Sequence, residues 1–193
     1  FKVAKWRVLA GMNFKKVKMI DGDGNKKPYG DMTPTTGNIN DIICIGFSPN
    51  DGSCPDENTL VSVIGSTSRN NLNNSINPTS GNKFSFGTEQ FVSIGKNSPT
   101  FNRMKASYAF FIPTKLINLT KACKSSDATS EDCPQAIGFQ FKAGTIIGEL
   151  PPYEAFCMGG TSSVRGWGSC DLAVSRSFVE GTAEYRFPVW RMI

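Results

Sequence analysis

Long runs of alternating apolar and polar residues restrict most strongly how this chain can fold. Six such runs cover residues 5–19, 59–69, 82–94, 101–112, 137–148 and 176–188. A period of two places successive side chains on opposite faces of a β-strand. No convincing helical period accompanies these runs. The sequence therefore predicts an all-β chain with about six antiparallel strands.

The two faces of the predicted strands differ in chemistry. In the last run, Val179, Ala183, Tyr185 and Phe187 share one face, while Glu180, Thr182, Glu184 and Arg186 share the other. A soluble β-sandwich binding module and a transmembrane β-barrel both alternate in this way. Strand length favours the barrel, because average strands have about 5–6 residues, whereas strands that cross a bilayer need about 9–11.

The number of strands predicts only part of a barrel. Membrane barrels close with at least about eight strands, so we expect residues 1–193 to form a partial barrel domain with two open edges. Long loops rich in Gly, Pro, Asn, Asp and Ser join the strands at about 21–58, 70–81 and 149–175. No apolar run approaches the roughly 18 residues of a membrane helix, which does not exclude a barrel.

Composition and motifs argue against nucleic-acid binding and against catalysis. The formal net charge is +5, but Lys and Arg are spread along the chain rather than gathered in a basic run. There is no His, the commonest general base and metal ligand. No phosphate-binding, dinucleotide-binding or nucleophile-elbow motif occurs. We therefore expect no catalytic residues, no cofactor and no enzyme activity.

One segment is similar to the start of a calcium-binding loop. Asp21–Asn25 contains alternating acidic and Gly residues, but Lys26 and Met32 stand where such a loop needs Gly and Glu. A polar turn is the better interpretation, and we predict no metal site.

The six cysteines fall into three local pairs, Cys44 with Cys54, Cys123 with Cys133, and Cys157 with Cys170. The first two pairs enclose turn-rich sequence, and the spacings do not suit zinc. Loop disulfides in an oxidising compartment are predicted, each contributing about 3 kcal/mol in the chain-entropy model. Free thiols in a reducing compartment are the alternative, and the spacing alone does not fix the connectivity.

The connection 149–175 holds the segment that is most informative about function. Its motif consists of Gly159 and Gly160, followed by Val164, Arg165, Gly166 and Trp167. The Gly pair permits a tight reversal of the backbone. An Arg in a long loop usually points to water. Glu184, however, lies on the polar face of its strand and would face the lumen of a barrel, where a contact with Arg165 would be charge-assisted.

Residues 146–190 resemble the C-terminal barrel, or bacterial surface antigen domain, of the bacterial outer-membrane protein insertases and the related chloroplast outer-envelope import channel. The matching segments are Gly148–Phe156, Gly159–Gly160, Ser163–Trp167, Arg176–Ser177 and Ala183–Pro188. The cyanobacterial branch of this family is the most similar. Upstream, Ser68–Asn71 and Pro78–Gly81 are similar to a strand-turn pattern of the family.

The resemblance implies a barrel of roughly sixteen strands with the motif loop inside its lumen. Arg165 would contact acidic residues of the inner wall, and Glu184 would be one of them. A second carboxylate, in an Asp-x-Gly strand, is expected beyond Ile193. Trp167 replaces the more usual Tyr or Phe of the family. A Cys157–Cys170 disulfide, which is not general to the family, is predicted to narrow the base of the loop.

The implied function is insertion of proteins into the outer membrane or their translocation across it, without covalent chemistry. Membrane lipids, unfolded outer-membrane proteins and accessory assembly proteins are the implied partners. The implied location is the bacterial outer membrane, or alternatively the chloroplast outer envelope. A dedicated two-partner secretion pore of the same superfamily is the nearest alternative function. A passive porin or structural surface antigen is a more distant one.

Overall fold

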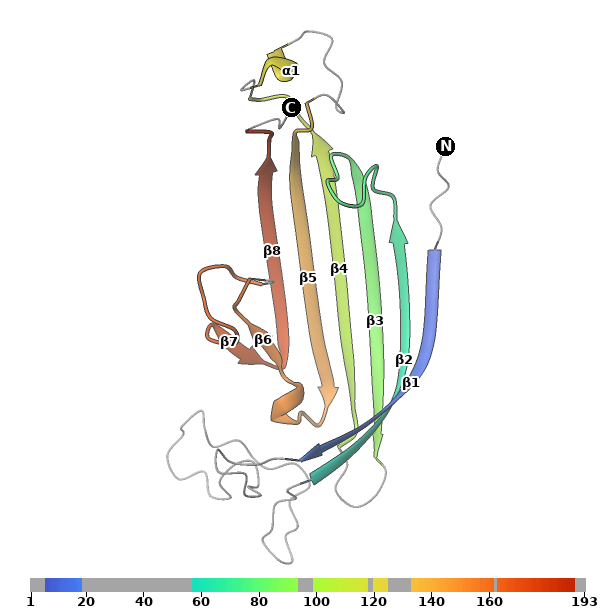
Figure 1. The fold of residues 1–193 in the computed structure, drawn as a ribbon. Helices are drawn as coiled ribbons and strands as arrows, with labels where there is room; N and C mark the ends of the chain where they lie inside the picture. Colours follow the sequence, from blue (N-terminus) through green and yellow to red (C-terminus); the bar gives the residue numbers. More distant parts are fainter. Residues whose placement is uncertain are drawn as a thin grey trace, which may run out of the picture.

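Six antiparallel strands form one sheet, in the order β1-β2-β3-β4-β5-β8 (Figure 1). The computed structural model describes residues 6–18, 57–93, 99–117, 120–124, 133–161 and 163–189. The strands are β1 Trp6–Lys18, β2 Glu57–Asn70, β3 Gly81–Ser93, β4 Phe101–Pro113, β5 Ala136–Gly148 and β8 Ser177–Arg186. The predicted all-β fold, a fragment of an antiparallel barrel, is thereby confirmed.

The shorter elements lie in the connections between these strands. A single helical turn, α1 Lys121–Lys124, precedes β5, and a 3-10 turn, η1 Pro152–Glu154, follows it. Strands β6 Phe156–Met158 and β7 Ala173–Ser175 form a separate two-stranded sheet. These elements were not predicted, because three or four residues are too few to show a period. Neither helical turn of the described ranges is long or apolar enough to cross a membrane.

The pairing register confirms the predicted division of the sheet into two faces. We call the side against which the connection 149–175 packs the polar face. Its charged side chains include Lys15, Glu89, Arg103, Lys105, Lys142, Glu180, Glu184 and Arg186. The opposite, apolar face exposes large side chains that include Trp6, Val8, Met12, Phe14, Val63, Tyr108, Phe141 and Val179. A sandwich would bury such a face, whereas a membrane barrel turns it to lipid.

The apolar stretches lie obliquely across the sheet. They run from Trp6 to Phe14 on β1, from Met104 to Ile112 on β4 and from Val179 of β8 to Phe187, which directly follows that strand. Each is close to the roughly 9–11 residues that a membrane strand needs. The register places Val8, near the beginning of the first stretch, level with Val179, at the beginning of the last. Strands that tilt within a bilayer need this offset to keep their apolar parts at one depth.

Buried apolar side chains gather at one end of the polar face. The cluster consists of Leu60, Phe91, Phe101, Ile146 and Phe156, with Val17, Leu150, Tyr153 and Phe178 packed against it. Phe91 and Phe101 stack with ring centroids 4.1 Å apart. Phe156 of β6 meets Phe178 of β8 edge to face at 4.8 Å. This apolar base holds the first part of the connection 149–175 against the sheet.

Candidate functional site

The connection 149–175, here called the motif loop, folds into a closed hairpin. Its strands β6 and β7 pair antiparallel, from Phe156 opposite Ser175 to Met158 opposite Ala173. Cys157 and Cys170 form a disulfide across this hairpin, with Cα atoms 4.7 Å apart. The Leu172 amide donates to the Met158 carbonyl at 3.2 Å. The disulfide therefore lies at the base of the motif, where the sequence predicts it.

The Gly pair reverses the chain at the start of the motif. Gly159 and Gly160 have φ angles of 118° and 86°, a region that side chains with a Cβ rarely adopt. A Cβ atom on Gly159 would also collide with the Gly168 carbonyl oxygen. The Gly160 amide donates to the Trp167 carbonyl at 3.0 Å, which joins the two ends of the motif. Both glycines are thus required by backbone geometry.

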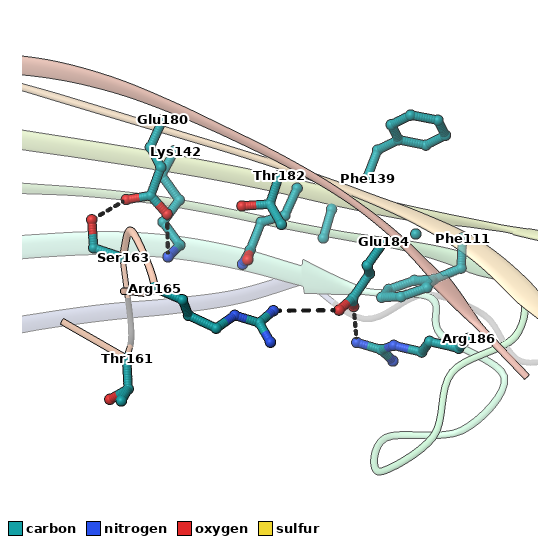
Figure 2. A pocket seen from close by; sticks show the side chains of 13 residues that line it. Phe111, Phe139, Lys142, Thr161, Ser163, Arg165, Glu180, Thr182, Glu184 and Arg186 are labelled. Carbon is teal, nitrogen blue, oxygen red and sulfur yellow. Dashed lines mark hydrogen bonds and ion pairs between the residues drawn. The ribbon is translucent and has the colours of Figure 1, made fainter. Parts of the chain in front are cut away.

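The tip of the hairpin brings Arg165 to the polar face (Figure 2). Arg165 Nη2 lies 3.9 Å from Glu184 Oε2, and the two side chains are 74% and 33% exposed. Glu184 also pairs with Arg186 of its own strand. Val164 is half-buried, and Trp167 is 53% exposed. Arg165 and Glu184 are therefore neighbours in a loose ion pair, and their bracing role stays a prediction.

A tighter contact between loop and sheet lies beside the tip. Ser163 Oγ donates to Glu180 Oε2 at 2.8 Å, and Lys142 Nζ donates to Glu180 Oε1 at 3.0 Å (Figure 2). The side chains of Lys142 and Glu180 are 29% and 9% exposed, so this pair is better shielded from water than Arg165 and Glu184. Sequence reasoning assigned Glu180 no role. Lys142 and Glu180 lie directly opposite each other in the register, a signal that appears only when strand pairing is known.

A cavity of about 270 Å³ separates the hairpin tip from the sheet. Its charged lining consists of Lys142, Arg165, Glu180, Glu184 and Arg186. The charged side chains around this cavity can pair with one another and form hydrogen bonds with water, so the hairpin tip is held by charge rather than by close packing.

Two further predictions about cysteines and metals concern other loops. Cys123 and Cys133 form a disulfide between β4 and β5, with Cα atoms 5.0 Å apart. The predicted pair Cys44 and Cys54 and the turn Asp21–Asn25 lie outside the described residues. Within the described ranges, no group of three or more Cys, Asp or Glu side chains is arranged to hold a metal ion.

Replacing Arg165 with Ala is expected to lower the unfolding free energy of the full-length barrel by no more than about 1 kcal/mol, because the pair is exposed and Glu184 keeps Arg186. Urea unfolding in lipid vesicles measures this change. The same substitution in a Glu184→Gln background is expected to have no further effect. A loss well above that limit in both backgrounds would show that Arg165 acts through another contact.

The family model of the Omp85 superfamily domain matches residues 2–192. Protein TOC75-4, chloroplastic, of Arabidopsis thaliana is 33% identical over 109 residues, covering 56% of this chain and 26% of that protein. Protein TOC75, chloroplastic, of Oryza sativa subsp. japonica is 34% identical over 109 residues, covering 56% and 12%. Outer envelope protein 80, chloroplastic, of Arabidopsis thaliana is 41% identical over 56 residues, covering 29% and 8%. The chain thus spans about a quarter or less of these relatives.

Proposed function

The chain belongs to the Omp85 superfamily, and we propose that it forms part of a barrel that inserts proteins into an outer membrane or moves them across it. The predicted resemblance to this superfamily is confirmed, while the closer similarity to its cyanobacterial branch stays a prediction. The protein is an outer-membrane protein, of bacteria or of the chloroplast envelope for which several relatives are named.

The observation that carries this proposal is a folded hairpin held against the polar face of a barrel wall. From the hairpin, Ser163 donates a hydrogen bond to Glu180 and Arg165 forms an ion pair with Glu184. Two carboxylates of the wall thus bind the hairpin. Loops also fold into the lumen of other outer-membrane barrels, so it is the hairpin together with the family match that favours protein insertion or translocation over a passive pore. The hairpin is held by one shielded contact, Ser163 with Glu180, and one exposed contact, Arg165 with Glu184. Such a hairpin can support the barrel wall while a polypeptide inserts or passes.

The proposed partners follow from the two faces of the sheet. Membrane lipids cover the apolar face, where Val8, Met12 and Val179 are each about 80% exposed. Unfolded outer-membrane proteins meet the polar face, and accessory assembly proteins act with the full-length protein. The proposed process makes and breaks no covalent bond.

The test is reconstitution of the full-length protein that contains this chain. Lipid vesicles with and without it are mixed with a urea-unfolded outer-membrane barrel protein. Folding is followed by gel electrophoresis, in which the unheated folded barrel migrates differently from the heated, unfolded protein. Translocation is followed by protection of the substrate from added protease. The protein is expected to accelerate one of these processes at least about tenfold, equivalent to a barrier lowered by about 1.4 kcal/mol.

The variant Arg165→Ala is expected to reduce this acceleration, whereas Arg165→Lys, which keeps the charge, is expected to reduce it less. Steady ion conductance with no acceleration would contradict the proposal and indicate a passive porin. Export of a single dedicated protein, with no effect on others, would indicate a secretion pore instead.

A further inference from the structure

The base of the motif loop contains a buried carboxylate with two cationic partners. Glu154 of η1 pairs with Lys15 of β1, 139 residues away in the sequence. Arg103 Nη1 of β4 lies 2.5 Å from Glu154 Oε2. The Glu154 side chain is 4% exposed, against 46% for Lys15 and 25% for Arg103. Cations from two strands thus converge on one loop carboxylate.

These two strands are not neighbours. Strands β2 and β3 lie between β1 and β4, so their axes would be about 14 Å apart in a flat sheet. The end of β1 that carries Lys15 sweeps across the other strands toward η1 (Figure 1). Glu154 therefore joins parts of the wall that the backbone ladder connects only through two intervening strands.

The surroundings of Glu154 are largely apolar. Lys15 lies opposite Leu60 in the register, and Arg103 lies opposite Ile146, both members of the buried cluster. Burial raises the pKa of the adjacent Tyr153 phenol, and the Glu154 carboxylate raises it further. A carboxylate loses hydration in such a place and is stabilised only by charged partners. Removal of Lys15 leaves Glu154 with Arg103 alone, whereas removal of the carboxylate leaves two cations without their shared partner at the loop base.

The ion pairs that hold the loop to the sheet differ in burial between the tip and the base of the loop. At the tip, Arg165 is largely exposed and 3.9 Å from Glu184. At the base, Glu154 is buried and paired from two sides. Exposed ion pairs contribute little to stability, because water readily replaces either partner. A buried ion pair instead holds its two side chains in one geometry.

We infer that Glu154 is a positioning residue, whose carboxylate ties the base of the motif loop to β1 and β4 and sets loop position and wall curvature together. A disturbance at the loop base then reaches β1, and a disturbance at Lys15 reaches the loop. The inference holds for insertion and for translocation alike. Its test requires no transported substrate, so it can fail or succeed independently of the proposed function.

The experiment measures hydrogen–deuterium exchange of the full-length protein in lipid vesicles. It compares Glu154→Gln and Lys15→Met with wild type over the motif loop and β1, with β8 as the internal reference. Each substitution is expected to raise exchange about tenfold in both segments, although each lies in only one of them. The double variant is expected to exchange no faster than Glu154→Gln, because Lys15→Met removes an ion pair that Glu154→Gln has already removed.

Two variants serve as controls. Glu149→Gln makes the same chemical change in the same loop, but Glu149 is exposed and accepts a hydrogen bond from the Thr100 amide at 2.9 Å. It is expected to leave exchange unchanged. Lys15→Arg keeps the charge and is expected to behave as wild type. If Glu154→Gln does not fold, the comparison of Lys15→Met with Lys15→Arg decides the matter.

Faster exchange confined to the substituted segment would overturn the inference, because the carboxylate would then act only locally. Equal effects of Glu149→Gln and Glu154→Gln would also overturn it.

Discussion

Arginine in place of Ala183 is expected to destabilise the barrel by about 2–4 kcal/mol, because its charge would enter the hydrocarbon region. Ala183 is an exposed residue of the apolar face, and it lies in the middle of the apolar stretch Val179–Phe187, which begins in β8 and ends just after it. The neighbouring outward residues of that strand, Gly181 and Tyr185, carry no charge to pair with it. The cost is greatest near the bilayer midplane and falls toward either interface.

The matched control is Thr182→Arg. Thr182 is the adjacent residue, so it faces the opposite way, and it lines the charged cavity with Glu180 and Glu184. Arginine there meets carboxylates and water, and a change below about 1 kcal/mol is expected. Urea unfolding of the two full-length variants in lipid vesicles gives both values. Equal stability of the two variants would contradict the assignment of the apolar face to lipid.

The strands and their faces are predictable because the signal is local. A period of two is visible within any one strand: the run at 101–112 corresponds to β4 at Phe101–Pro113, and the run at 176–188 to β8 at Ser177–Arg186. The choice between a sandwich and a barrel is less local. It follows from strand length together with the exposed apolar face, which requires the whole sheet.

Contacts between distant segments could not be predicted from the sequence. The pair Lys142 and Glu180 depends on the register of β5 and β8, and Glu154 meets Lys15 only because the sheet bends toward the loop. Neither the register nor the bend leaves a trace in composition or spacing. Glutamate, lysine and serine are also too common on polar faces to mark a particular contact.

Arg165 could be singled out because its surroundings are unusual in sequence. Small residues flank it, and a family motif contains it. The structure brings it to Glu184, as parity suggested, but the better shielded contacts of the loop are made by Ser163 and Glu154. The motif therefore marks where the loop meets the wall, while the strength of that contact lies in residues that the motif does not single out.

Substitutions of the motif glycines test how much the backbone geometry of the hairpin contributes to its stability, apart from its side-chain contacts with the wall. Gly159→Ala is expected to destabilise the closed hairpin by about 3 kcal/mol or more, because strain at a positive φ adds to a steric collision. Its φ is 118°, and its Cβ would collide with the Gly168 carbonyl oxygen, a backbone atom that cannot turn aside. The Cys157–Cys170 disulfide holds the two sides of the hairpin together and leaves little room for relaxation.

Gly166→Ala is the matched control, since its φ of 95° is also positive but a Cβ there has no atom within 4 Å. Strain alone should cost about 1–2 kcal/mol. Hydrogen–deuterium exchange over β6 and β7 measures both losses, and 3 kcal/mol corresponds to about a hundredfold faster exchange. Equal losses would mean that φ alone decides and that the close approach of Gly159 to Gly168 is incidental. A larger loss for Gly159→Ala would show that the close approach of Gly159 to Gly168 stabilises the hairpin in addition to the φ requirement.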